Sequence, residues 1–263
     1  MAILSSEYFH HAGDHNSTAD AGAAQMLLEL KIPFDVIDGT SEFSPYAVII
    51  LPDDIPVDGA LAERLNAFVG QGGGLLLSGN SALGADGQFA VAAGICSEGP
   101  VTFTPSYIGL GDELRIFPDQ NALCCLWHGP ADRGAGRPCA GPSRAPYFNR
   151  TYAHFSSHAH APDNTDAAPL GAAVTLSGRV GYIAYPIFGI YHNVGQPLYR
   201  HVVKALLSRL LPKPALSTDL PSAGRATLTH QAERNRHILH LLYGPPWYAA
   251  RPCRTGRGPA SWK

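Results

Sequence analysis

The residue with the clearest catalytic potential is Ser81, which follows the apolar run Leu75-Leu76-Leu77. A buried strand that ends abruptly in small residues typically leads into a tight turn. Nucleophile elbows of the form Gly-x-Ser-x-Gly occupy such turns, because glycine lets the backbone pass close to an exposed nucleophile. Here the turn reads Gly79-Asn80-Ser81-Ala82-Leu83, so the closing glycine is missing. Two interpretations of Ser81 follow: it is a nucleophile, or it is a turn serine that caps the next segment.

A serine nucleophile also needs a histidine base and an acid that orients it. In the layout of class I glutamine amidotransferases, a His-Pro-Glu at the end of a late strand supplies both. The corresponding strand here ends in Tyr185-Pro186-Ile187. Neither Tyr185 nor Ile187 takes a proton from serine at neutral pH. We therefore predict that Ser81 is not catalytic and that no histidine or acid lies within hydrogen-bond reach of its hydroxyl.

Three histidines, His154, His158 and His160, form a second group. Imidazoles four residues apart share one face of a helix, so His154 and His158 are candidate metal ligands. A metal site would need a further ligand, for which Asp163 is the nearest carboxylate. The alternatives are ordinary structural histidines, or a polar surface that contacts carbohydrate or a neighbouring subunit. We expect no metal and no cofactor.

The segment around these histidines is the predicted binding or interface surface. We expect aromatic side chains to anchor one face of it in the core: Tyr147, Phe148, Tyr152 and Phe155. The polar groups would then be held in place before binding, which lowers the cost of association. The candidate contact residues of this segment are Asn149, Arg150, Tyr152, His154, His158 and His160.

His10 and His11 extend this candidate surface, because they follow the first predicted strand. Open α/β sheets usually bind ligands at the edge where the parallel strands end. The segment from His10 to His15 is polar, so it is either a solvated loop or a contact surface for another domain or subunit. We expect the segment from Phe148 to His160 to lie beside it.

The elements that must position these residues alternate between strands and helices. Apolar runs predict strands at 2–5, 34–37, 47–51, 75–77 and 180–185. Helical spacing predicts helices at 18–30, 61–68 and 198–211, the first with Thr18 as its N-cap. Strands that are apolar throughout indicate a parallel sheet covered on both faces. The fold class is therefore α/β, with a flavodoxin-like doubly wound parallel sheet over residues 1–212.

Residues 213–263 are predicted to form a small partial β module and an irregular tail. Arg225–His230 and Arg236–Tyr243 flank a turn and form a β-hairpin. A lone hairpin is marginally stable, so we expect it to dock on the main domain or to be truncated. Residues 124–145 and 245–263 are rich in Pro, Gly, Arg and Cys and lack periodicity. They are interpreted as loop and tail, or as locally frameshifted translation of GC-rich coding DNA.

Composition excludes several classes of function. The 263 residues carry a net charge of −2, which gives no electrostatic basis for binding nucleic acid. No apolar run approaches the length of about 20 residues that a membrane span needs. The first residues have neither a basic n-region nor a long apolar h-region, so we expect no signal peptide. Five cysteines without a Cys-x-x-Cys pair argue against a zinc site or a secreted disulfide framework. We expect a cytoplasmic protein without nucleic-acid or membrane partners.

Four segments together resemble the β-galactosidase trimerisation domain, an amidotransferase-like domain of some glycoside hydrolases. They are 2–6, 34–38, 46–53 and 72–79. A second set of segments, 146–160 and 185–188, is similar to bacterial putative glycosyl hydrolases that carry this domain, and 235–246 continues the likeness.

The resemblance implies a non-catalytic oligomerisation or accessory domain of a glycoside hydrolase whose catalytic TIM barrel is absent from this chain. The implied partners are further copies of the chain or a glycosidase barrel. Two alternatives stay open: a carbohydrate-binding accessory domain, or a stand-alone amidotransferase- or protease-like hydrolase that uses Ser81.

Overall fold

The fold was analysed in a computed structural model of the chain. It describes residues 1–9, 18–84, 86–100, 103–112, 114–115, 122–125, 132–134, 138–157, 160–211 and 213–244. The helices are η1 (Ser6–Phe9), α1 (Thr18–Leu30), α2 (Gly59–Gly70), α3 (Ile187–Val194), α4 (Pro197–Leu210) and η2 (Ala232–Arg234). The strands of the first half are β1 (Ala2–Leu4), β2 (Asp35–Ile37), β3 (Val48–Leu51), β4 (Gly74–Ser78), β5 (Ser97–Pro100) and β6 (Ser106–Gly109). The remaining strands are β7 (Ala122–Cys125), β8 (Asp132–Gly134), β9 (Pro138–Arg144), β10 (Gly171–Ser177), β11 (Val180–Ile183), β12 (Gly224–Gln231) and β13 (Arg236–Tyr243).

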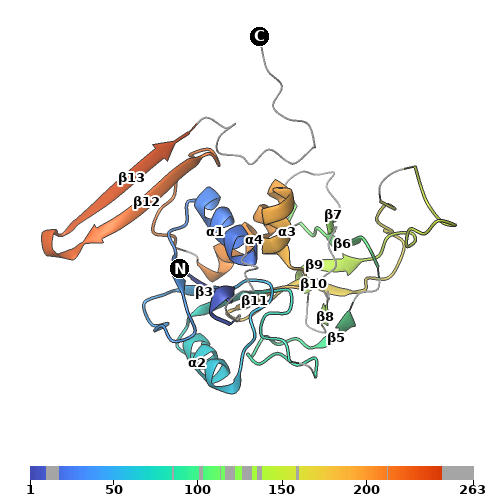
Figure 1. Cartoon of the computed structure of the whole chain (residues 1–263), viewed down its shortest axis with the longest axis horizontal. Coiled ribbons are helices and arrows are strands. Elements are labelled where there is room, and N and C mark those ends of the chain that lie inside the picture. The colour runs from blue at the N-terminus through green and yellow to red at the C-terminus, as the bar shows by residue number, and fades with distance from the viewer. Residues whose placement is uncertain are drawn as a thin grey trace, which may run out of the picture.

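A parallel sheet in the order β2-β1-β3-β4-β11 forms the centre of the molecule. This is the strand order of flavodoxin-like folds. Helices α1, α3 and α4 cover one face of the sheet and α2 covers the other (Figure 1). Because both faces are covered, the residues of β3 and β4 are buried throughout. The predicted α/β class and doubly wound sheet are confirmed.

Local sequence explains where the covering helices begin and which face they bury. The Asp58 side chain accepts a hydrogen bond from the Leu61 backbone N–H at 2.8 Å and so caps α2. Helix α4 begins with Pro197 at its first position, and α3 is followed by Gly195 in the left-handed conformation. The buried stripe of α2 consists of Leu61, Leu65 and Phe68, as its spacing predicts.

The sheet continues beyond β11 with antiparallel strands, which we did not predict. Strand β10 pairs with β11, and β9, β6 and β7 follow in that order. Strand β8 also pairs with β10, and β5 pairs with β8. The interpretation of 124–145 as loop is therefore wrong where β7, β8 and β9 lie. Residues 245–263 lie outside the described residues.

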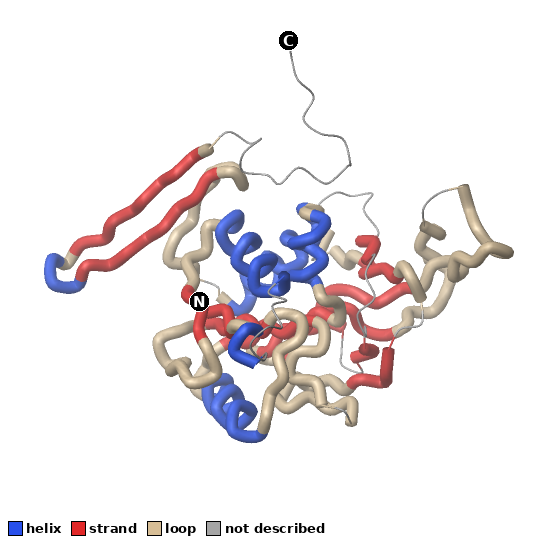
Figure 2. The backbone as a smooth tube through the Cα atoms, in the orientation of Figure 1, coloured by secondary structure: helices blue, strands red, loops and turns tan. Residues whose placement is uncertain are grey.

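Strands β12 and β13 form a separate antiparallel hairpin, paired from Gly224–Tyr243 to Gln231–Arg236. It projects from the body of the molecule, and only the start of β12 lies near α1 (Figures 1 and 2). The predicted hairpin is present, but most of its length is not docked on the main domain. In the described part of the chain, no helix has the length and apolar character needed to cross a membrane.

Candidate functional site

The turns that follow β3, β4 and β11 meet at one edge of the parallel sheet. The Asn80 N–H donates to the Asp53 carbonyl at 2.6 Å, and the Gly79 N–H donates to the Ile183 carbonyl at 2.9 Å. The Tyr182 hydroxyl donates to the Gly79 carbonyl at 3.0 Å. A Cβ at Gly79 would lie 2.4 Å from the Asp53 carbonyl oxygen, so this close approach of backbones requires glycine.

Ser81 is fully buried in this turn. Its hydroxyl accepts a hydrogen bond from the Ile55 backbone N–H at 3.0 Å. Within the described residues, no histidine or carboxylate is bonded to it. Tyr185, which stands where the amidotransferase histidine would be, is also buried and shares a 2.9 Å hydrogen bond with Ser143. This geometry suits a serine that fastens the 53–55 turn to the sheet, not one that attacks a substrate.

Replacing Ser81 with alanine is expected to lower the free energy of unfolding by about 1–2 kcal/mol, because the buried Ile55 N–H would lose its acceptor. Any hydrolase activity measured for the chain should stay unchanged. Urea denaturation and a hydrolase assay on the same preparation test both points. Loss of an activity without loss of stability would identify Ser81 as a nucleophile.

Asp53 is a residue of this edge whose role we did not predict. The sequence indicated only that Pro52-Asp53-Asp54 stops a strand. Its buried carboxylate accepts hydrogen bonds from the Ser78 hydroxyl at 2.7 Å and the Gly189 N–H at 2.6 Å, and a longer one from the Phe188 N–H at 3.3 Å. Burial raises the pKa of Asp53 to about 6, although these hydrogen bonds favour the charged form and oppose the shift.

The Asp53 carboxylate thereby joins β4 to the first turn of α3. Phe188 and Gly189 are the second and third residues of that helix, whose free N–H groups and dipole favour a negative charge. Asp53 itself adopts a left-handed backbone conformation, with φ of 54°. Its contacts assign it a structural role. The sequence signal that could have revealed it is a carboxylate placed directly after a fully buried parallel strand.

The segment at 147–157 is an irregular loop, which we call the aromatic loop. The backbone bonds Tyr147 N–H to Pro162 carbonyl (3.1 Å) and Asn164 N–H to Ala145 carbonyl (3.0 Å) close its base. An ion pair between Arg144 and Asp163 at 3.2 Å lies at the same place. The helix on which His154 and His158 would share a face is therefore not formed in the described part of this segment.

The expectation that aromatic residues anchor this segment in the core is wrong for three of the four. Tyr147, Tyr152 and Phe155 are exposed to solvent. The side chain of Tyr152 is the most open of the three, with 97% of its surface accessible. Phe148 is half-buried and stacks on His154, with ring centroids 5.2 Å apart. The physical reason is that the loop leaves the sheet at the end of β9, and in the part of the chain that the structure describes these three side chains are not covered by a helix or strand.

The polar candidates of the aromatic loop lie at the surface. Asn149, Arg150 and His154 are exposed, and the Asn149 side-chain oxygen accepts a bond from the Thr104 N–H at 3.1 Å. His160, just beyond the loop, is exposed as well.

Strand β9 runs parallel to β11, because both pair antiparallel with β10. The aromatic loop therefore leaves the sheet at the edge where the parallel strands end. It is separated from β1 by the width of β3, β4, β11 and β10.

Three further candidates, His10, His11 and His158, lie outside the described residues. Contact between the aromatic loop and the His10–His15 segment therefore stays a prediction. The expectation that His154 and His158 bind no metal stays a prediction as well, because His158 is not among the described residues. Within the described residues, no group of three histidine, cysteine or acidic side chains could hold a metal ion.

The hairpin is the second surface that exposes apolar side chains. Leu239, Leu241, Leu242 and Tyr243 of β13 are all exposed. Side chains alternate along a strand, so Leu239, Leu241 and Tyr243 share one face and Leu242 lies on the other. A two-stranded sheet with apolar side chains on both faces lacks the cover that makes such sheets stable.

Comparison with known proteins shows what this architecture is similar to. Residues 24–97 match the family model of the beta-galactosidase trimerisation domain. No curated protein sequence matches significantly. Among solved structures, alpha-L-fucosidase isoenzyme 2 from Paenibacillus thiaminolyticus superposes with a TM-score of 0.83 at 32% identity. The match covers 94% of this chain and 38% of the fucosidase.

Two β-galactosidases share the fold at lower identity. The enzyme from Bacillus circulans sp. alkalophilus has a TM-score of 0.55, and that from Rahnella sp. R3 has one of 0.56. Both are 16% identical, and each match covers 86% of this chain and 33% of the enzyme. The chain thus spans only about a third to two fifths of the proteins it resembles. The resemblance seen in the sequence is confirmed: residues 24–97 are similar to the β-galactosidase trimerisation domain, and the whole chain has the fold of part of these glycosidases.

Proposed function

We propose that this chain is a non-catalytic assembly domain of a glycoside hydrolase, and that it packs against further copies of itself or against a glycosidase barrel. The observation that carries the proposal is the distribution of exposed apolar side chains. Among the residues that the structure describes, most of the exposed large apolar side chains lie on the aromatic loop and on β13. Exposed apolar patches on a protein surface mark interaction sites, and aromatic residues are enriched at the centres of interfaces.

The carboxyl edge of the sheet supports the non-catalytic part of the proposal. Glycoside hydrolysis uses two carboxylates that flank the scissile bond and reach the substrate. The carboxylate at the centre of this edge, Asp53, is instead buried and bonded to protein donors. The whole protein would owe its activity on a β-galactoside or an α-L-fucoside to residues beyond this fold.

Self-association should depend on the aromatic loop. The double replacement Tyr152→Ser and Phe155→Ser is expected to weaken association at least about tenfold, because two exposed aromatic anchors are removed. Sedimentation velocity or light scattering over a concentration series measures the effect. Leu28→Ser provides the control, since Leu28 is exposed on α1 away from the loop. A wild-type chain that stays monomeric throughout the series, or a control that dissociates equally, would refute self-association through this loop.

A second candidate function is carbohydrate binding by the same loop. The nearly fully exposed Tyr152 ring lies next in sequence to Thr151 and near Arg150, so an apolar face and polar groups occur together. Binding of the double variant to immobilised β-galactoside or α-L-fucoside separates the two functions. If the double variant loses sugar binding but keeps the molecular mass of wild type in solution, the loop is a carbohydrate site. If it keeps sugar binding but has a lower molecular mass in solution, the loop serves assembly.

A further inference from the structure

A basic cavity lies between the end of α1, the first half of α4 and the segment that leads into the hairpin. It has a volume of about 280 Å³, and Lys31, Arg200, His201 and Lys204 contribute to its lining. Glu29 is its acidic member. No residue of the aromatic loop or of β13 lines this cavity, so neither proposed function uses it.

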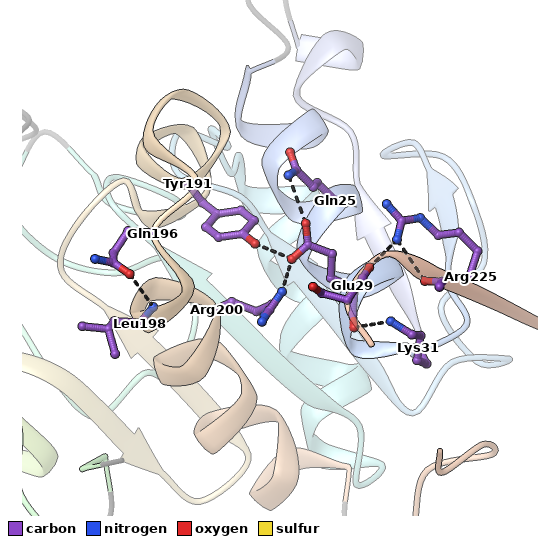
Figure 3. A network of polar contacts seen from close by, with 10 residues as sticks. Gln25, Glu29, Lys31, Tyr191, Gln196, Leu198, Arg200 and Arg225 are labelled. Atoms are coloured by element: carbon purple, nitrogen blue, oxygen red, sulfur yellow. Dashed lines mark hydrogen bonds and ion pairs between the residues drawn. The ribbon is translucent and has the colours of Figure 1, made fainter. Parts of the chain in front are cut away.

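The negative charge of Glu29 is already neutralised by contacts within the protein. Its carboxylate pairs with Arg200 and accepts hydrogen bonds from the Tyr191 hydroxyl and from the Gln25 amide (Figure 3). Each carboxylate oxygen therefore has at least one donor. What remains in the cavity is the charge of Lys31 and Lys204 and the imidazole of His201, with no carboxylate of the described residues paired to either lysine.

Lys31 is the unusual member of this group. It is only 3% exposed, it adopts a left-handed backbone conformation directly after α1, and its ammonium donates one bond, to the Glu29 carbonyl at 2.7 Å. An ammonium carries three donors. Burial, together with the nearby charges of Arg225 and Arg200, lowers the pKa of Lys31. Figure 3 shows Arg225 beside Glu29 on the side opposite Arg200. A bound anion would relieve this crowding of positive charge.

A second, more apolar cavity adjoins the basic one. It has a volume of about 220 Å³ and shares Leu30, Lys204 and Thr218 with the basic cavity. Ile32, Leu207, Leu211 and Leu216 contribute its apolar lining. Together the two cavities reach the size of small-molecule sites, about 300–1,000 Å³, in which apolar walls are combined with a few polar groups.

We propose that the two cavities form one binding site for a small organic anion, with a phosphate or carboxylate group at Lys31 and Lys204 and an apolar group between Ile32 and Leu216. The lining chemistry supports each half of this ligand. Asp219, although next to the lining residue Thr218, lines neither cavity, so among the described residues Glu29 is the one carboxylate in the lining. Ammonium groups bind phosphate and carboxylate through charge-assisted hydrogen bonds.

Titration calorimetry with phenyl phosphate tests the proposal. Inorganic phosphate and phenol, which correspond to the anionic and the apolar half of that ligand, are titrated for comparison. Phenyl phosphate should bind more tightly than either half, and its affinity should fall as NaCl is raised. Lys204→Gln should lower the affinity for phenyl phosphate and for inorganic phosphate about tenfold, as expected for loss of a charge-assisted bond. Leu216→Ser should weaken phenyl phosphate alone, because the apolar cavity does not contact free phosphate.

Lys213→Gln is the matched control, since Lys213 is exposed and lines neither cavity. Lys204 and Leu216 are not fully buried, so both variants should fold, and thermal melting verifies this. Equal affinities of the Lys204→Gln variant and wild type, or an equal loss in Lys213→Gln, would overturn the proposal. Absence of saturable phenyl phosphate binding would also overturn it. In that case, a change in the molecular mass that the Lys204→Gln variant has in solution would identify the surface around the two cavities as a subunit contact.

Discussion

Replacing Asp53 with alanine is expected to lower the free energy of unfolding by about 2 kcal/mol at neutral pH. The change leaves the N–H groups of Phe188 and Gly189 and the Ser78 hydroxyl without their acceptor in a buried place. Unsatisfied buried donors cost about 1–3 kcal/mol each, partly offset here because an ionised buried carboxylate is removed as well. Urea denaturation followed by circular dichroism measures the loss.

The stability that Asp53→Ala loses relative to wild type should grow as the pH falls. The pKa of Asp53 is raised to about 6 in the folded chain, whereas an unfolded aspartate titrates near about 4. The folded state therefore holds the proton more tightly, so the stability contributed by this titration is complete below about pH 4 and disappears as the pH rises through about 6. At about 1.4 kcal/mol per pKa unit, the difference between wild type and Asp53→Ala should widen by about 2–3 kcal/mol over this window.

Asp54→Ala is the control for both measurements. Asp54 is the neighbouring carboxylate, is exposed and has no side-chain hydrogen bond to another described residue that would be lost. The charge of Asp54 is the smallest of the influences on the pKa of Asp53, so its removal should change stability by less than about 0.5 kcal/mol at any pH in the window. If the stability difference between wild type and Asp53→Ala does not change with pH, the Asp53 pKa is not raised. The role of Asp53 in joining β4 to α3 would then be supported only by the loss of stability at neutral pH.

The parallel half of the sheet could be predicted because its residues obey simple rules. Val48–Leu51 and Leu75–Leu77 are apolar at every position, which is typical of strands covered on both faces. The antiparallel strands could not be predicted in the same way. Strand β9 contains two prolines and a glycine, and it forms because β10 and β6 offer partners that are distant in sequence.

The candidate site shows the same limit. The polar side chains at 149–154 could be identified from the sequence. Their aromatic neighbours were expected to be buried, but three of the four are exposed. Burial of Tyr152 or Phe155 needs an element packed against the loop, and no local pattern reveals that none of the described elements covers these side chains. Asp53 was missed for the opposite reason: its donors on α3 are more than 130 residues away in the chain. Spacing along the sequence therefore identified residue types but not their partners.

The contact between α1 and α3 should tolerate no side chain at Gly22. A Cβ there would lie 2.0 Å from the Phe188 carbonyl oxygen, a backbone atom that cannot rotate away. Gly22→Ala is therefore expected to cost about 3 kcal/mol, since α3 must shift to relieve the overlap. Gly70→Ala is the control, because nothing lies within 4 Å of its Cβ position at the end of α2. It should leave stability unchanged or raise it by up to about 1 kcal/mol.

Combining Gly22→Ala with Asp53→Ala tests whether Gly22 and Asp53 hold α3 in place together. A shift of α3 at Phe188 would pull the Phe188 and Gly189 N–H groups away from the Asp53 carboxylate, so part of the loss in each single variant has the same origin. The double variant Gly22→Ala and Asp53→Ala should then lose less stability than the two single losses together, by at least about 0.5 kcal/mol. Additive losses in urea denaturation would mean that Asp53 stabilises β4 rather than α3, and that the N-terminal turn of α3 is positioned by its packing on α1.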